Sequence, residues 1–97
     1  MPDRSLTIGL DFDDTYTADP ELWDRFVCVA SQRGHRVVVV TCRRDTEENR
    51  KALQEADLPC LWFYANMGAK ETVLRHEHGI EVDIWIDDDP ACVNFRR

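Results

Sequence analysis

The chain has 97 residues, of which 43% are hydrophobic and 32% charged, as is typical of a single globular domain spanning residues 1–97. No apolar run approaches the roughly 20 residues that a membrane span needs, and the first residues lack the features of a signal peptide, so we expect a cytoplasmic protein with no membrane partner. The net charge of −7 argues against an extended nucleic-acid surface, because phosphate binding relies on Lys and Arg.

Strand and helix signals alternate from the start of the chain. Residues 6–10 form an apolar run that predicts a strand. Asp19-Pro20-Glu21 then supplies an N-cap, a proline at the first helical position and an acid in the first turn, which predicts a helix that ends at Gly34. Val37–Val40 is an unbroken β-branched run, as expected of a strand that is covered on both faces.

The same alternation continues through the second half of the chain. Asp45–Glu48 has the pattern of a capping box and predicts a second helix, which Pro59 ends. We expect a third strand at Cys60–Tyr64, a third helix over about residues 68–78 and a fourth strand at Val82–Ile86. The order β-α-β-α-β-α-β indicates an α/β fold with a parallel sheet and helices on both of its faces.

The cysteines have neither disulfide nor metal-binding spacing. The chain contains Cys28, Cys42, Cys60 and Cys92, with no C-x-x-C pair among them. We therefore expect buried, reduced thiols.

The acidic residues are concentrated in two short runs. Six of the nineteen belong to them: Asp11, Asp13, Asp14, Asp87, Asp88 and Asp89. One run follows the first predicted strand and the other follows the fourth, so the carboxylates converge if these strands are neighbours. Anions at that distance destabilise a fold unless a cation lies between them, and oxygen ligands favour Mg²⁺. For Asp14 and Asp89, capping a turn is an equally good explanation.

The first acidic run, Asp11-Phe12-Asp13-Asp14-Thr15, resembles the D-x-D-x-T motif of the haloacid dehalogenase (HAD) superfamily of phosphohydrolases, although that family usually has Gly where Asp14 stands. The other motifs follow in order: a hydrophobic strand ending in Thr41, a lone lysine, Lys70, at a helix start, and Asp87-Asp88 after a strand. The resemblance spans residues 6–89. It implies a three-layer Rossmann-like (HAD-like) fold with a four-stranded parallel sheet in the order 3-2-1-4.

The resemblance also implies a Mg²⁺-dependent phosphomonoester hydrolase. Asp11 would attack the phosphoryl group and form an aspartyl-phosphate, and Asp13 would be the general acid and then the general base. Thr41 would hydrogen-bond a phosphoryl oxygen, and Lys70 would balance the negative charge of nucleophile and phosphate. A solvated helix face is the alternative explanation for Lys70.

Further residues are implied for the metal and the substrate. The expected metal ligands are the carboxylates of Asp11 and Asp87, the backbone carbonyl of Asp13, and Asp88 either directly or through water. The expected phosphate-binding or substrate-binding residues are Thr15, Cys42 and Arg43. Arg43 could hold a second phosphate or a carboxylate, or it could simply be solvated.

The substrate is not identified by the sequence. The gaps at residues 14–20 and 65–69 are too short for the cap domains that many family members carry, which leaves an open site. A nucleotide, a sugar phosphate or a phosphate on a macromolecule would fit this description. Few residues follow Asp89, so a homo-oligomer could cover an exposed part of the sheet.

The main alternative is a regulatory module of the same fold that binds phosphate and metal without catalysis. A receiver-like signalling domain is disfavoured because the third strand ends in Phe63-Tyr64-Ala65-Asn66 and lacks an aspartate to accept a phosphoryl group. A nuclease-like metal site of the Toprim kind would need the acidic motifs in the reverse order.

Overall fold

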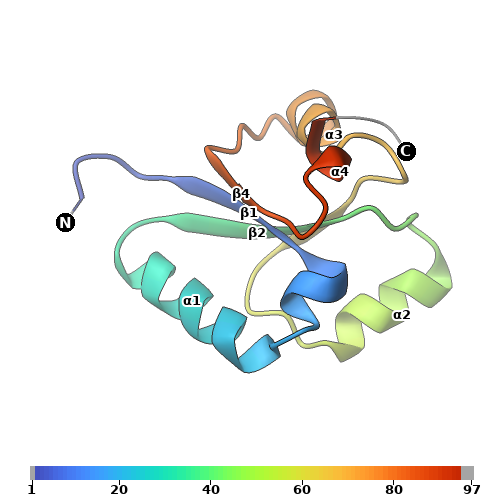
Figure 1. Cartoon of the computed structure of the whole chain (residues 1–97), viewed down its shortest axis with the longest axis horizontal. Helices are drawn as coiled ribbons and strands as arrows, with labels where there is room; N and C mark the ends of the chain where they lie inside the picture. The colour runs from blue at the N-terminus through green and yellow to red at the C-terminus, as the bar shows by residue number, and fades with distance from the viewer. Residues whose placement is uncertain (1, 95–97) are drawn as a thin grey trace.

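The computed structural model of the protein describes residues 2–94, which fold around a four-stranded sheet (Figure 1). The strands are β1 (Thr7–Asp11), β2 (Arg36–Thr41), β3 (Trp62–Tyr64) and β4 (Ile84–Ile86). All three pairings are parallel, and the spatial order is β3-β2-β1-β4. The predicted fold class and strand order are therefore confirmed.

Within the described residues, four α-helices cover the two faces of the sheet. They are α1 (Pro20–Gln32), α2 (Glu47–Glu55), α3 (Lys70–His78) and the single turn α4 (Ala91–Asn94). Helices α1 and α2 lie on one face, and α3 and α4 lie on the other (Figure 1). The connections over residues 12–19 and 65–69 are short and carry no inserted domain, as the sequence predicted.

The core is split into two layers because side chains alternate along each strand. Ile8, Leu10, Val37 and Val39 pack with residues of α1 and α2, including Val27, Ala30 and Leu53. The intervening residues Val38 and Val40 face the other way and pack with Leu74 of α3. The β-branched run of β2 is thus buried on both faces, as its composition predicted.

The two edge strands are shorter than the sequence predicted. The third strand was expected from Cys60 and the fourth from Val82, whereas β3 starts at Trp62 and β4 at Ile84. Each edge strand has a partner on one side only, so its ends lie where pairing to β2 or β1 ends. The prediction followed the apolar runs of the sequence. Only part of each run forms hydrogen bonds with the neighbouring strand.

The turn after β1 accommodates an aspartate where glycine is usual in the family that the motif resembles. Phe12–Tyr16 forms a wide turn (η1), in which the amide of Thr17 donates to the carbonyl oxygen of Phe12. Asp14 has φ 65°, in the left-handed region that favours glycine and also tolerates Asp. Its amide donates to Thr17 Oγ1 at 3.0 Å. The departure from the motif therefore leaves a well-formed turn.

Gly9 is required where β1 passes beneath an indole ring. A Cβ placed on Gly9 would lie 2.6 Å from two ring carbons of Trp85 on the neighbouring strand. We predict that Gly9→Ala lowers the free energy of unfolding by about 1–3 kcal/mol, because the ring or the strands must shift. Urea denaturation of the variant measures this change. The same substitution in a Trp85→Leu background should cost much less, and an equal cost in both backgrounds would contradict the steric explanation.

All four cysteines are free thiols, as predicted, but the prediction that they are buried was wrong. Cys28 lies on the solvent side of α1 and is exposed, and Cys42, Cys60 and Cys92 are partly exposed. Burial raises the pKa of the Cys60 thiol to about 11.

Within residues 2–94, none of the helices has the length and apolar character needed to cross a membrane.

Candidate active site

The two acidic runs meet because of the register between β1 and β4. Leu10 pairs with Ile86, so Asp11 and Asp87 follow at the carboxyl ends of neighbouring strands. Leu10 and Ile86 pack on the α1 side of the sheet, and the alternation of side chains directs the next residues toward the α3 side. The sheet order also reverses at β1, which is where parallel α/β sheets commonly bind ligands.

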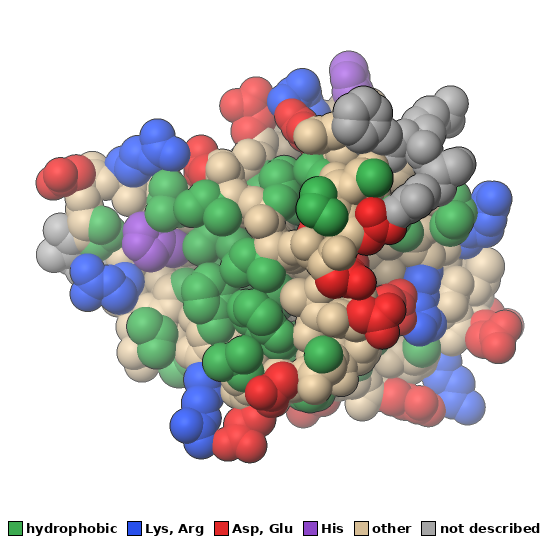
Figure 2. All heavy atoms as spheres, in the orientation of Figure 1, with side chains coloured by type: hydrophobic (Ala, Val, Ile, Leu, Met, Phe, Trp, Pro, Cys, Tyr) green, Lys and Arg blue, Asp and Glu red, His purple; other side chains and the backbone are tan. Residues whose placement is uncertain are grey.

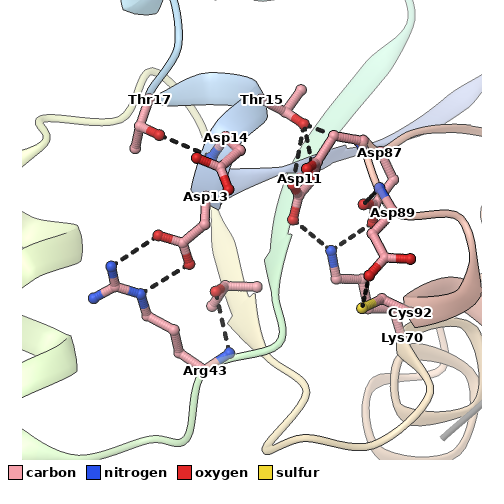
Figure 3. A network of polar contacts seen from close by, with 12 residues as sticks. Asp11, Asp13, Asp14, Thr15, Thr17, Arg43, Lys70, Asp87, Asp89 and Cys92 are labelled. Carbon is pink, nitrogen blue, oxygen red and sulfur yellow. Dashed lines mark hydrogen bonds and ion pairs between the residues drawn. The ribbon is translucent and has the colours of Figure 1, made fainter. Parts of the chain in front are cut away.

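Lys70, the first residue of α3, occupies the space between these two carboxylates. Its Nζ lies 2.6 Å from Asp11 Oδ1 and 2.6 Å from Asp87 Oδ2, as Figure 3 shows. The lysine side chain is 1% exposed, and those of Asp11 and Asp87 are 8% and 3% exposed. A buried lysine is rare unless it is paired, so this residue belongs to the site and not to a solvated helix face.

Thr15 joins the nucleophile candidate to the second acidic run. Its hydroxyl lies 3.0 Å from Asp11 Oδ2 and 3.4 Å from Asp88 Oδ1, and it accepts a hydrogen bond from the amide of Asp88 at 3.3 Å. Asp87 is held from its own loop, because its Oδ1 accepts from the amide of Asp89 at 2.9 Å. Both oxygens of Asp11 and both of Asp87 therefore have hydrogen-bond donors.

Burial and the neighbouring charges shift the pKa values of the groups in the cluster. Burial raises the pKa of Asp11 to about 6, against the opposing effect of its hydrogen bond to Lys70. Burial alone would lower the pKa of Lys70, but its hydrogen bonds to Asp11 and Asp87 raise it above the ordinary value. Lys70 is thus held charged between the carboxylates of Asp11 and Asp87, and the carboxylate of Asp88 lies close to both of them.

The donor set fits a divalent cation. Asp11, Asp87 and Asp88 each offer an oxygen, and these three atoms lie within 4.8 Å of one another. All three ligands are carboxylates, which suit a hard cation such as Mg²⁺. With Lys70 charged, the three carboxylates leave an excess of two negative charges, which one divalent cation would neutralise.

Asp13 points away from this cluster and toward β2. Both of its carboxylate oxygens accept hydrogen bonds from Arg43, at 2.8 Å from Nη2 and 3.0 Å from Nε (Figure 3). The hydrogen bonds to Asp13 raise the pKa of Arg43 above its ordinary value. The sequence had suggested Arg43 as a substrate-binding residue, whereas its guanidinium group is engaged by Asp13.

Two residues that the sequence analysis did not single out hold Arg43 in place. Its Nη1 donates to Asn49 Oδ1 at 3.2 Å, and its guanidinium carbon lies 5.4 Å from the centre of the Phe12 ring. Asn49 is in the first turn of α2 and Phe12 lies within the D-x-D motif itself. No sequence pattern marks either contact, because both depend on how the loop after β2 folds.

The remaining predicted residues flank the cluster. Thr41 ends β2, is fully buried, and its Oγ1 accepts from the amide of Arg43 at 3.2 Å. Cys42 follows Thr41 in the chain. Burial raises the pKa of the Cys92 thiol to about 11, and a hydrogen bond with the Cys42 thiol contributes to this increase. The thiol of Cys42 therefore faces α4, where Cys92 also contacts Asp89 Oδ2 at 3.6 Å.

A hollow of about 400 Å³ adjoins the acidic cluster. Thr15, Asp87 and Asp88 line one side, and the apolar side chains of Leu22 and Trp23 line another. Figure 2 shows acidic side chains gathered beside a broad apolar area on this face. A larger hollow of about 500 Å³ lies at the amino ends of the strands, between α1 and the segment at Pro59 and Cys60, far from the three clustered carboxylates. The smaller hollow is therefore the one that the cluster could use.

No protein-family model, curated protein or solved structure matches this chain. The resemblance to the HAD superfamily therefore depends on the four sequence motifs alone.

Proposed function

We propose that this protein is a HAD-like phosphatase, a Mg²⁺-dependent phosphomonoester hydrolase in which Asp11 is the nucleophile. The observation that carries the proposal is the environment of Asp11 at the end of β1. One of its oxygens accepts from Lys70, the other from Thr15, and two further carboxylates lie beside it. A carboxylate fixed in this way is oriented for attack, and the adjacent lysine can balance the charge of an incoming phosphate.

The proposed reaction has two steps. A carboxylate oxygen of Asp11 forms a bond to phosphorus while the ester P–O bond breaks, and Asp13 gives its proton to the departing oxygen. Water then attacks the aspartyl-phosphate, Asp13 takes a proton from that water, and the bond between Asp11 and phosphorus breaks to release phosphate. The same carboxyl group thus acts first as an acid and then as a base, and the enzyme is regenerated.

The residues that would hold Mg²⁺ are Asp11, Asp87 and Asp88 through their carboxylates and Asp13 through its backbone carbonyl. When bound, the ion would supply charge neutralisation for the phosphoryl oxygens. The chain's own contribution is Lys70, which places an ammonium group against Asp11. Its positive charge would offset the negative charge of an incoming phosphoryl group. Thr41 is proposed to hydrogen-bond another phosphoryl oxygen, since it ends the neighbouring strand β2.

The open site supports phosphomonoesters of varied size. The connections that follow β1 and β3 contain no cap that would enclose a substrate. A nucleotide, a sugar phosphate or a phosphate on a macromolecule would each reach Asp11. A homo-oligomer that covers the edge of the sheet would narrow this choice.

The test is release of inorganic phosphate from a panel of nucleotides, sugar phosphates, phosphopeptides and 3′- or 5′-phosphorylated oligonucleotides. We expect turnover of at least one class with Mg²⁺ and loss of turnover with EDTA, restored when Mg²⁺ is added back. Activity that survives EDTA would contradict the metal-dependent mechanism. Binding of Mg²⁺ without turnover of any substrate would favour the alternative, a regulatory module that keeps the metal site without catalysis.

A further inference from the structure

Strand β4 is one of the two open edges of the sheet. It pairs with β1 on one side and lies at the end of the order β3-β2-β1-β4. The amide of Asp83 donates to the carbonyl oxygen of Thr7, at the start of β1. A strand directs its backbone groups alternately to its two sides, so the amides and carbonyls of Ile84 and Ile86 point away from β1, toward the outer edge.

The side chains beside this edge are apolar. Ile84 is 45% exposed, and Ile86 is partly exposed on the same face of the sheet. On α1, the exposed Leu22 lines the hollow beside the acidic cluster together with Trp23 and Ile86. Figure 2 shows a broad apolar area where Figure 1, in the same orientation, places β4 and α1. An exposed apolar edge strand is a template for pairing with another chain.

The three residues of β4 are self-complementary in an antiparallel pair. With Trp85 on the two-fold axis, Ile84 of each copy lies opposite Ile86 of the other, and each such pair exchanges two backbone hydrogen bonds. The outward backbone groups of Ile84 and Ile86 are the ones that this register uses. The isoleucine side chains meet on the α1 face, and the two Trp85 side chains approach each other on the α3 face.

The charges at the two ends of β4 favour the same arrangement. Arg4 lies at the amino end, largely exposed, with its guanidinium group 3.2 Å from Asp83, whereas Asp87 and Asp88 follow the carboxyl end. An antiparallel pair brings the amino end of one strand beside the carboxyl end of the other, so Arg4 of each copy approaches the acidic end of its partner. Asp83 also approaches that end, but its carboxylate is engaged by Arg4 and by the amide of Thr7.

We propose that the protein forms a homodimer in which two β4 strands pair antiparallel and join the two four-stranded sheets into one continuous sheet. The interface uses the same surface of both copies, so the assembly closes at two chains. No catalytic step enters this inference, and it stands apart from the proposed hydrolase function. It has one consequence for the site, because the hollow lined by Leu22, Ile86 and Asp88 lies at this edge and would be bordered by the partner's Ile84.

Sedimentation equilibrium over a concentration series measures the association. We expect the mass to rise from 11.3 kDa toward twice that value. Hydrogen exchange on the same series should show peptides that cover β4 becoming better protected at high concentration, while exchange at β3, the other edge, stays unchanged. A wild-type protein that remains at 11.3 kDa up to its solubility limit would overturn the proposal, as would unchanged exchange at β4 in a dimer.

Ile84→Lys is the main variant, because a lysine on an edge strand opposes pairing with a second chain. We expect it to stay monomeric at concentrations at which the wild type is a dimer. Since Ile84 is exposed in the single chain, the fold should persist, which far-UV circular dichroism checks. Leu61→Lys is the matched control: Leu61 is 63% exposed and directly precedes the other edge strand, β3, so the dimer should be unchanged.

A dimer that survives Ile84→Lys would use another surface, and one that is lost in Leu61→Lys would use the β3 edge; either result contradicts the proposed interface. Arg4→Ala tests the charge pairing. It should raise the dissociation constant at low salt and have a smaller effect at high salt, and no change at low salt would argue against the antiparallel arrangement. These measurements need no substrate, so absence of phosphatase activity would leave their outcome unaffected.

Discussion

Asp11→Asn is expected to reduce phosphate release by about 10⁴-fold or more, because an amide cannot form the aspartyl-phosphate. The fold should survive this change. Asparagine has nearly the same size, and one of the crowded negative charges near Lys70 is removed. The measurement is kcat on the best substrate of the panel, with thermal unfolding recorded on the same samples.

The matched control for this variant is Asp57→Asn. Asp57 is exposed, lies in the loop after α2 and has φ 53°, a conformation that asparagine also tolerates. The control should retain full activity. If Asp11→Asn kept more than about a tenth of the wild-type rate, Asp11 would not be the nucleophile, and the chemistry of this site would need another explanation.

Lys70→Met is expected to lower the free energy of unfolding by about 3–5 kcal/mol in EDTA, because it leaves two buried carboxylates facing each other without a cation. Asp11 and Asp87 each lie 2.6 Å from the lysine Nζ, and both side chains are almost fully buried. Since a small domain is stable by only about 5–15 kcal/mol, much of its stability would be lost. Urea denaturation followed by tryptophan fluorescence measures the change.

The same variant tests the metal site independently of catalysis. Mg²⁺ bound to the carboxylates would replace part of the lost positive charge, so the destabilisation should be smaller in Mg²⁺ than in EDTA. Lys51→Met is the natural control, because Lys51 is exposed on α2 and its ion pair with Glu55 is 3.9 Å long. It should change stability by less than about 0.5 kcal/mol. If Lys70→Met behaved like this control in EDTA, the buried network would not have the energetic role assigned to it.

The sequence predicted the fold well because its signals are local and periodic. The unbroken run Val37–Val40 indicated a strand covered on both faces, and both faces of β2 are indeed packed. The helix before it begins at Pro20 as the Asp19-Pro20 pair predicted, with the Asp19 side chain accepting from the amide of Leu22. The ends of β3 and β4 were less predictable, since they depend on how far each edge strand pairs with its neighbour.

The candidate site was only partly predictable. Asp11 ends β1 and Asp87 directly follows β4, so the pairing of these two neighbouring strands is enough to bring the two carboxylates together. Arg43 is different, because its contact with Asp13 spans 30 residues and needs the loop after β2 to turn back toward the D-x-D motif. The environment of Cys42 likewise depends on the tertiary structure, because its thiol lies beside Cys92 near α4.

The sequence by itself determined the parallel α/β fold and the position of two acidic runs at strand ends, because strand periodicity and helix signals depend on nearby residues. Only the tertiary structure decided that Lys70 lies buried between two carboxylates, that Thr15 bridges Asp11 and Asp88, and that Arg43 binds Asp13. These contacts depend on strand register, on the position of α3 and on the shape of two loops. Each is fixed by packing across the whole domain, which no local pattern encodes.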